Sequence, residues 1–412
     1  MKICLLSYRG HPYGGGQGIY IHHLSKALCA LGHEVQLLSG PPHPNVIETI
    51  KVHKLESLDL YSLNGRLPDR PLRMLTPLNF CEVVSTLLGF FPEPFTFSIR
   101  AYVRLRSILR RERFDIIHDN QSLGYGLLLM RHFDIPIVCT IHHPVSVDRD
   151  IDVRNAKGWW QKFKMMRWYS FLPMQRFVSR RMDRIVAVSH NSADDTARMF
   201  KIRRDKFRVV HNGVDINLFD KDESVVKEPN SLIVVGGHSP IKGLVHLLRA
   251  IRLLRGEKDL KLTVVGGSPN GTYSSGLVRE YGLGDVVTFT GRVSPEELVR
   301  CYSASEVAVV PSLYEGFGFP AAEAMSCGVP VISTTAGALP EVVGPDGEAG
   351  LLVPPGDADA LAEAISRLLA DDLLRKKMGE AARRRVESHF TWEEAAKKTV
   401  AVYEELLTDA HR

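Results

Sequence analysis

Two glutamates and a glycine-rich segment stand together in the second half of the chain. Glu315 opens the run Glu-Gly-Phe-Gly-Phe-Pro, and Glu323 follows eight residues later. Pro320 is typical of the first turn of a helix and Gly328 of a position past its end, so a helix over 320–326 is predicted. The loop before it brings backbone N–H groups to a helix N-terminus, a favourable place for a diphosphate. Two carboxylates beside that anion could accept hydrogen bonds from the hydroxyl groups of an attached sugar and ribose. A favourable interaction with the helix dipole would account for Glu323 taken by itself, without a ligand.

A second glycine cluster lies near the start of the chain. Four glycines between positions 14 and 18 follow a predicted strand over 3–7 and precede a predicted helix over 19–31. Their spacing is not the G-x-G-x-x-G of dinucleotide-binding proteins, and the second strand ends at Ser39 and Gly40 without an acidic ribose ligand. An NAD-dependent oxidoreductase is therefore disfavoured. The cluster suits a backbone that approaches a ligand closely, and a simple tight turn explains it equally well.

Strands and helices alternate along both halves of the chain. Short and almost wholly apolar segments separated by helical segments indicate parallel sheets covered on both faces. The predicted strands occupy 3–7, 35–38, 115–118, 137–141, 184–188, 207–210, 232–235, 262–265, 286–290, 307–310, 331–333 and 350–353. Because 412 residues exceed one hydrophobic core, we expect an α/β protein with two doubly wound domains that face each other across a cleft. Residues 61–113 show no readable pattern and indicate an insertion rich in Pro and Arg.

The composition is that of an ordinary globular protein, with 44% hydrophobic and 24% charged residues. No apolar run is long enough to span a bilayer, and the first residues resemble a strand more than a signal peptide. The six cysteines are scattered without a C-x-x-C pair, which disfavours zinc and disulfide frameworks and favours a reducing cytoplasm. Residues 1–210 hold 31 Lys and Arg against 18 Asp and Glu, so this half is expected to meet an anionic partner.

Taken together, these features resemble the retaining GT-B glycosyltransferases, in particular family 4. The segment from Glu315 to Glu323 is similar to the E-x7-E motif of that family. Other short motifs follow in the family's order along nearly the whole chain: Gly15 with Gly16, GHEV, FDIIHD, TIHHP, VAVSHNS, HNGVD, SPIKG, GVPVIST, GLLVPPGD and FTWEEA. The resemblance implies a GT-B fold of two Rossmann-like domains. These would be an acceptor-side domain over 1–212, joined by a C-terminal helix over 390–412, and a nucleotide-sugar-binding domain over 213–389.

The resemblance also implies roles for individual residues. Of the two catalytic residues, Glu315 would contact the donor sugar at the reacting face, and His142 would touch that sugar or its leaving phosphate. Glu323 would hold the ribose hydroxyls, and Lys242 would neutralise the diphosphate. The remaining donor-binding positions would act mainly through their backbone: Gly15, Gly16, Val293, Gly316, Phe317, Gly318 and Phe319.

The family's chemistry implies neither a metal nor another cofactor. Retention is attributed to front-face substitution, in which the departing phosphate oxygen helps to deprotonate the acceptor. Lys242 and the loop N–H groups would stabilise the charge that develops on the diphosphate. No Asp-x-Asp pair is placed to bridge a metal to the phosphates. This chain departs from its relatives at Gly237, where most carry a second phosphate-binding cation, an arginine; His238 is adjacent.

Residues 154–184 contain nine Lys and Arg, one Asp and several interleaved aromatic side chains. The pattern suits the interface of an anionic membrane, where aromatic rings lie at headgroup level. A solvated basic face with its aromatic residues packed inward is equally compatible with it. Nucleic acid is disfavoured as a partner because no nucleic-acid-binding module is present.

The sequence therefore predicts a cytoplasmic retaining hexosyltransferase, peripheral at the inner face of the membrane. Its donor would be a nucleotide-diphosphate sugar, with UDP favoured over GDP on family frequency. Its acceptor would be a lipid-linked or other glycan, or a small molecule. One alternative is a nucleotide-sugar 2-epimerase on the same fold, which would turn over the donor alone. The other is a non-catalytic sugar-nucleotide-binding protein, which would not need His142, Lys242 and both glutamates.

Overall fold

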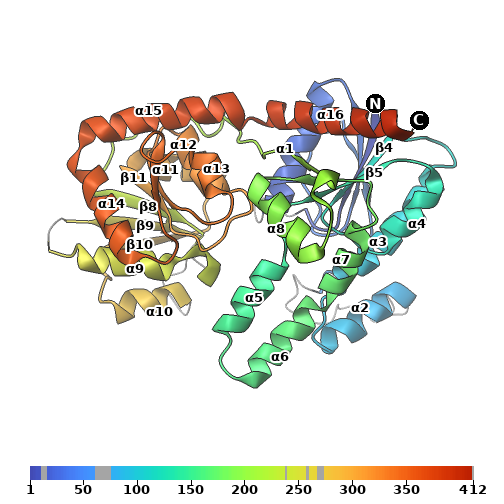
Figure 1. Ribbon diagram of the computed structural model, residues 1–412, viewed down its shortest axis with the longest axis horizontal. Helices are drawn as coiled ribbons and strands as arrows, with labels where there is room; N and C mark the ends of the chain where they lie inside the picture. The colour runs from blue at the N-terminus through green and yellow to red at the C-terminus, as the bar shows by residue number, and fades with distance from the viewer. Residues whose placement is uncertain (11–15, 61–75, 237–238, 257–258, 267–272, 411–412) are drawn as a thin grey trace. The chain divides into compact units, whose positions relative to one another are not determined.

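The computed structural model describes residues 1–10, 16–60, 76–236, 239–256, 259–266 and 273–410 (Figure 1). The chain forms two compact units, each with its own sheet and core. The first unit comprises Met1–His211 and Ala395–Arg412, and the second comprises Asn212–Glu394.

Within the described residues, the first unit is built on a seven-stranded parallel sheet with the order β3-β2-β1-β4-β5-β6-β7. The chain thus adds strands outward from β1 in both directions, as in doubly wound folds. The strands are β1 (Lys2–Ser7), β2 (Glu34–Ser39), β3 (Lys51–Lys54), β4 (Ile116–Asn120), β5 (Ile137–Ile141), β6 (Arg184–Ala187) and β7 (Phe207–Val209). Every residue of β4 and β5 is buried, because helices cover both faces of the sheet.

Eight α-helices lie in the described residues of this unit before its last helix. They are α1 (Gly16–Ala30), α2 (Pro77–Leu87), α3 (Glu93–Ile108), α4 (Gly126–Met130), α5 (Ser146–Asn155), α6 (Trp159–Trp168), α7 (Leu172–Ser179) and α8 (His190–Phe200). Helices α1 and α3 bury one apolar face each, with Leu24, Leu28 and Leu105 inaccessible to solvent. Figure 1 shows α5 and α6 as a pair that extends away from the sheet.

The second unit has, in its described residues, a six-stranded parallel sheet with the order β10-β9-β8-β11-β12-β13. Its strands are β8 (Ser231–Val235), β9 (Lys261–Val265), β10 (Val287–Gly291), β11 (Val307–Val310), β12 (Val331–Thr334) and β13 (Gly350–Val353). Its helices are α9 (Leu244–Leu253), α10 (Tyr273–Glu280), α11 (Pro295–Ala304), α12 (Phe319–Ser326), α13 (Leu339–Val343), α14 (Ala358–Ala370) and α15 (Asp372–His389). The core lies where α9 and α14 pack on the central strands, with Leu247, Leu248 and Ile365 fully buried.

The last helix, α16 (Trp392–Ala410), belongs to the first unit from Ala395 onward. Glu405 on this helix accepts hydrogen bonds from Arg184 Nε at 3.0 Å and Arg208 Nε at 2.8 Å. The hydroxyl of Tyr403 lies 2.6 Å from His118 Nδ1 inside the unit. Two charged contacts and one buried contact therefore join the end of the chain to strands that are far away in sequence.

The predicted α/β class with two Rossmann-like units is confirmed. Each predicted strand is present, with ends that differ from the prediction by no more than two residues. The prediction missed β3, whose sequence Lys-Val-His-Lys carries no apolar run because it is an edge strand. It also missed α2 and α3 within the segment 61–113, as well as α15, whose surface is mostly polar. No helix in the described part of the chain is long and apolar enough to cross a membrane.

Candidate active site

Helix α12 begins directly after a glycine-rich turn in the second unit. Gly318 stands before the first residue of the helix with φ of 104°, and Pro320 occupies its first turn. A Cβ at Gly318 would lie 2.8 Å from the side chain of Leu339, so both backbone angle and space favour glycine here. Among the described residues, the N–H groups of Phe317, Gly318 and Phe319 have no hydrogen-bond acceptor. These three donors and the helix dipole form a site suited to an anion.

Lys242 and Glu315 form an ion pair beside this turn. Lys242 ends a short 3₁₀ helix (Pro240–Lys242), and its Nζ lies 2.6 Å from Glu315 Oε1. The same carboxylate oxygen accepts a hydrogen bond from Ser312 Oγ at 2.8 Å. Gly243 allows the close approach, since a Cβ there would lie 1.9 Å from the carbonyl oxygen of Pro311. The pair joins two segments that are 73 residues apart, and it holds the lysine head group near the anion site.

Glu323 is buried one turn into α12. Its side chain accepts a hydrogen bond from the Tyr302 hydroxyl at 3.2 Å. Burial raises the pKa of Glu323 to about 7, although the Tyr302 hydrogen bond and the charge of Lys242 partly oppose the increase. This carboxyl group is therefore poised to change its protonation state near neutral pH.

The aromatic residues of the turn have a structural role in addition to the one predicted for their backbone. Phe317 is buried and contacts Phe319 and Phe390 with ring centroids 5.3 and 5.8 Å apart. Phe319 also stacks on Trp392 at 6.3 Å. The cluster anchors the turn while leaving its N–H groups available. Val293 lies in the loop between β10 and α11 and is half-buried.

His142 directly follows β5 in the first unit and is buried. Its Nε2 lies 2.7 Å from Asn120 Oδ1, and the amide nitrogen of Asn120 donates to the carbonyl of Gln17 at 3.2 Å. Because the second contact orients the amide, Nε2 must carry the proton and Nδ1 keeps its lone pair. Tyr20 packs edge-on against the ring at 4.8 Å. Burial lowers the pKa of His142 to about 3, so the ring is neutral.

The loop after β4 fixes the backbone at His142 and His143. Gln121 has φ of 53°, an uncommon value for a residue with a side chain. Its Oε1 accepts from His142 N at 2.7 Å, and its Nε2 donates to the carbonyl of His143 at 2.8 Å. The side chain of His143 instead contacts Asp148 at 2.6 Å.

The structure thus brings together Lys242, Glu315 and Glu323 in the second unit, next to the turn that contains Gly316 to Phe319. His142 lies in the first unit with Gln17, the neighbour of Gly16, where α1 begins. Gly15 and Gly237 lie outside the described residues. Sequence reasoning missed Asn120, Gln121 and Tyr302 as partners of the predicted residues. Polar residues at the carboxyl end of a predicted strand were a signal for the first two.

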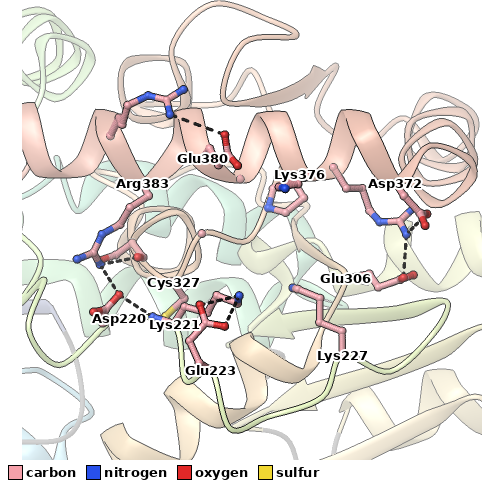
Figure 2. Close-up of a pocket in the computed structure, with 16 residues that line it drawn as sticks. Asp220, Lys221, Glu223, Lys227, Glu306, Cys327, Asp372, Lys376, Glu380 and Arg383 are labelled. Atoms are coloured by element: carbon pink, nitrogen blue, oxygen red, sulfur yellow. Dashed lines mark hydrogen bonds and ion pairs between the residues drawn. The ribbon is translucent and has the colours of Figure 1, made fainter.

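No cluster of side chains able to hold a metal ion occurs in the described ranges. A cavity of about 670 Å³ lies elsewhere in the second unit, against α15 (Figure 2). Its charged groups are largely engaged with one another. Lys221 pairs with Glu223 at 2.7 Å, and Arg383 donates to the carbonyl of Ser326 at 2.6 Å. The cavity adjoins the C-terminal end of α12 at Ser326, and its lining includes none of Lys242, Glu315 and Glu323 at the opposite end.

Comparisons with known proteins agree with this architecture. Residues 14–218 match the family described as "Glycosyltransferase Family 4", and residues 215–385 match "Glycosyl transferases group 1". The chain is 42% identical over 415 residues to the MMP α-(1→4)-mannosyltransferase of Mycolicibacterium hassiacum, covering 99% of this chain and 98% of that protein. It is 27% identical over 431 residues to the D-inositol 3-phosphate glycosyltransferase of Corynebacterium diphtheriae, with coverage of 98% and 94%.

A solved structure is similar over the same length. Sucrose-phosphate synthase from Thermosynechococcus elongatus superimposes with a TM-score of 0.76 and 28% identity, covering 99% of both chains. The resemblance to a glycosyltransferase family seen in the sequence is therefore confirmed over the whole chain. The chain belongs to glycosyltransferase family 4, with a group 1 domain in its second half, and it is a glycosyltransferase.

Proposed function

We propose that this glycosyltransferase moves a hexosyl group from a nucleotide-diphosphate sugar to a glycan or lipid-linked acceptor with retention of anomeric configuration. The observation that carries the proposal is the grouping of Lys242, Glu315 and Glu323 around the N-terminus of α12. One cation, three free N–H groups and two carboxylates match a ligand that has both phosphates and hydroxyl groups.

The donor diphosphate is assigned to the N–H groups of Phe317 to Phe319 and to Lys242. When the phosphates arrive, the Lys242 ammonium serves both Glu315 and the new anion, and negative charge grows on the phosphate as the glycosidic bond breaks. Preorganised donors stabilise that charge without reorganisation. Glu323 accepts hydrogen bonds from the ribose hydroxyls, and Glu315 contacts the sugar.

His142 is assigned to a hydroxyl group of the transferred sugar. A neutral ring with a lone pair on Nδ1 accepts a hydrogen bond and carries no charge for a phosphate. This favours the sugar over the leaving phosphate as its partner. Lys242 then remains the cation that serves the leaving group.

Mannose is the first candidate for the transferred sugar because the relative that is 42% identical is named as a mannosyltransferase that makes an α-(1→4) linkage. An α product formed from an α-linked donor corresponds to retention. For the base, UDP remains the expectation from family frequency, and GDP is the alternative that the experiment must separate from it.

The direct test is turnover with UDP- and GDP-linked glucose and mannose, with and without a mannoside acceptor. Transfer requires release of nucleoside diphosphate together with a new α-glycoside, identified in NMR by the one-bond coupling between the anomeric carbon and its proton. Release of nucleoside diphosphate that needs no acceptor and yields no glycoside would favour the epimerase. Tight binding without turnover of any donor would favour the non-catalytic alternative, and a β-linked product from an α-linked donor would refute retention.

We further propose that helix α6 contacts an anionic membrane at the inner face. Trp159, Trp160 and Met166 are 76%, 60% and 61% exposed, and Lys162 and Lys164 are exposed beside them. Large exposed aromatic side chains can insert at the boundary between the lipid headgroups and the acyl chains, and neighbouring lysines can pair with negatively charged headgroups. This supports membrane contact over aromatics packed inward.

Membrane contact is tested by sedimentation with vesicles of phosphatidylcholine alone or mixed with phosphatidylglycerol. Recovery in the pellet should require the anionic lipid, fall with added salt, and fall again in the double variant Trp159→Ala, Trp160→Ala. The variant Phe80→Ala on α2, 61% exposed, is a control for general loss of apolar surface. Equal recovery with both vesicle types would refute the proposal.

A further inference from the structure

A cavity of about 580 Å³ in the first unit lies between α5, α7 and the end of α8. It is lined by Ser146 at the start of α5, by Arg149 on the same helix, by Arg176 on α7, and by Arg180 directly after α7. His142 is not part of its lining. The roles assigned above to the donor and to α6 do not involve this cavity.

Arg176 is unusual among these residues because its side chain makes no hydrogen bond or ion pair within the described part of the chain. Its Nε is buried and meets no acceptor. By contrast, Arg180 Nε donates to the carbonyl of Phe200 at 2.7 Å, and Arg149 donates twice to Asp150 at 2.9 and 2.7 Å. A buried donor without an acceptor costs stability, and native proteins seldom keep one that has no use.

The charge around the cavity is unbalanced. Three guanidinium groups line it against one carboxylate, that of Asp150, and this carboxylate is already engaged by Arg149. The other acidic side chains of α5, Asp148 and Asp152, are engaged by His143 and by the Tyr169 hydroxyl. The excess of positive charge is therefore directed at the cavity, and an anion with about two negative charges would offset it.

The rest of the wall is apolar. It is formed by Leu172, Pro173, Phe177, Met199 and Phe200. A free inorganic anion would use the arginines and leave this surface in water, whereas an ester with an apolar body would use both. Arginine forks match the paired oxygens of a phosphate group, and this match favours phosphate over a simple halide or a single carboxylate.

We propose that this cavity binds the phosphate group of a phosphate ester whose organic part lies on the apolar wall. Arg176 supplies the main contact, and Arg149 and Arg180 add their free N–H groups. Two sources share this chemistry: the headgroup of a membrane phospholipid and a soluble phosphorylated compound. The proposal is independent of the donor and of glycosyl transfer.

The experiment is calorimetric titration of the full chain with glycerol 1-phosphate and with a water-soluble, short-chain phosphatidic acid. Wild type should bind both, the lipid more tightly. Arg176→Gln should weaken binding by roughly tenfold or more through loss of a charge-assisted contact. Because Arg176 holds no other described group in place, the variant should keep its melting temperature. Arg198→Gln on α8, 74% exposed, removes the same charge outside the cavity and should bind as wild type does.

Two further arms make the result decisive. Lys242→Ala should keep the Arg176-dependent binding, which separates this cavity from the donor diphosphate site. Arg176-dependent pelleting with phosphatidic acid vesicles would identify a headgroup as the source, and Arg176-dependent binding of glycerol 1-phosphate without pelleting would identify a soluble compound. If Arg176→Gln misfolds, Arg176→Lys, which keeps the charge but loses the fork, should give intermediate affinity. Equal binding by wild type and the folded Arg176 variants overturns the proposal.

Discussion

The two units offer different electrostatics at their candidate sites. In the second unit, Lys242 and Glu315 form an ion pair, and Glu323 has a pKa near neutrality. In the first unit, His142 is kept neutral by burial and held in one tautomer by Asn120. The charged side chains lie in the second unit, beside the proposed diphosphate site. The first unit instead offers the uncharged imidazole of His142 as a hydrogen-bonding group. Under the proposed function the two units would divide the work: the second unit would stabilise developing charge, and the first would orient hydroxyl groups.

Loss of the cation should have the largest effect. Lys242→Ala removes a charge-assisted contact worth about 1.5–3 kcal/mol, so kcat/KM should fall roughly tenfold to a hundredfold. Glu315, which is mostly buried, also loses its partner, so the melting temperature should fall. Steady-state kinetics at saturating acceptor measures the effect, with the exposed Lys261→Ala as a control. Unchanged kinetics would mean that other residues bind the phosphates.

Introducing charge beside His142 should weaken the division between the units. Asn120→Asp places a carboxylate where Nε2 now meets an amide oxygen at 2.7 Å, and such a neighbour raises the pKa of the imidazole. Protonated Nδ1 no longer accepts a hydrogen bond, so kcat of the variant should fall as pH drops toward 6, by about tenfold per unit below the new pKa. The kcat of the wild type should show no such decrease caused by protonation of His142. Identical pH profiles would show that the Nδ1 lone pair is not used.

Glu323 gives the second unit its own pH dependence. Its pKa is raised to about 7 from the ordinary 4.5, so between these values the folded state holds a proton that the unfolded state releases. Stability from this group is therefore present at low pH and is lost as pH rises toward 7. Nucleotide binding has the opposite trend, since ribose hydroxyls require the carboxylate, and affinity should fall by up to tenfold per pH unit below 7.

Calorimetry of UDP and GDP binding between pH 5.5 and 8.5 measures this dependence, with proton release seen as a buffer-dependent enthalpy. Glu323→Gln is isosteric and cannot titrate, so it should bind weakly at every pH and melt at a higher temperature than wild type above pH 7. A wild-type affinity that does not vary with pH would contradict the ribose assignment.

The smallest effect is expected at Tyr302. Tyr302→Phe removes the hydroxyl that donates to Glu323 at 3.2 Å, a contact worth about 1 kcal/mol. Because this contact lowers the pKa of Glu323, its loss should move the acid limb of nucleotide binding to higher pH, with affinity about threefold lower at pH 7 and about fivefold lower at more acidic pH. An acid limb at the wild-type position would show that burial alone controls Glu323.

The sequence by itself determined the periodic parts of this protein. Apolar strands such as 137–141 and 307–310 were predicted with their observed ends, because a strand buried on both faces allows little but apolar residues. The turn before α12 was equally readable, since a left-handed Gly318 followed by Pro320 is a local requirement of the backbone. Family motifs added the candidate residues Glu315, Glu323 and His142.

Only the tertiary structure decided how these residues are partnered. Lys242 meets Glu315 across 73 residues, and Asn120 meets His142 across 22, distances at which no local pattern acts. The pKa of Glu323 and that of His142 depend on burial by segments remote in the chain. Within the described residues the Arg176 side chain has no partner, and the sequence could not show this, because in the basic segment 154–184 Arg176 resembles every other arginine. Hydrogen-bond partners and burial from solvent exist only in the folded chain. They therefore give residues of the same type different pKa values and different chemical roles.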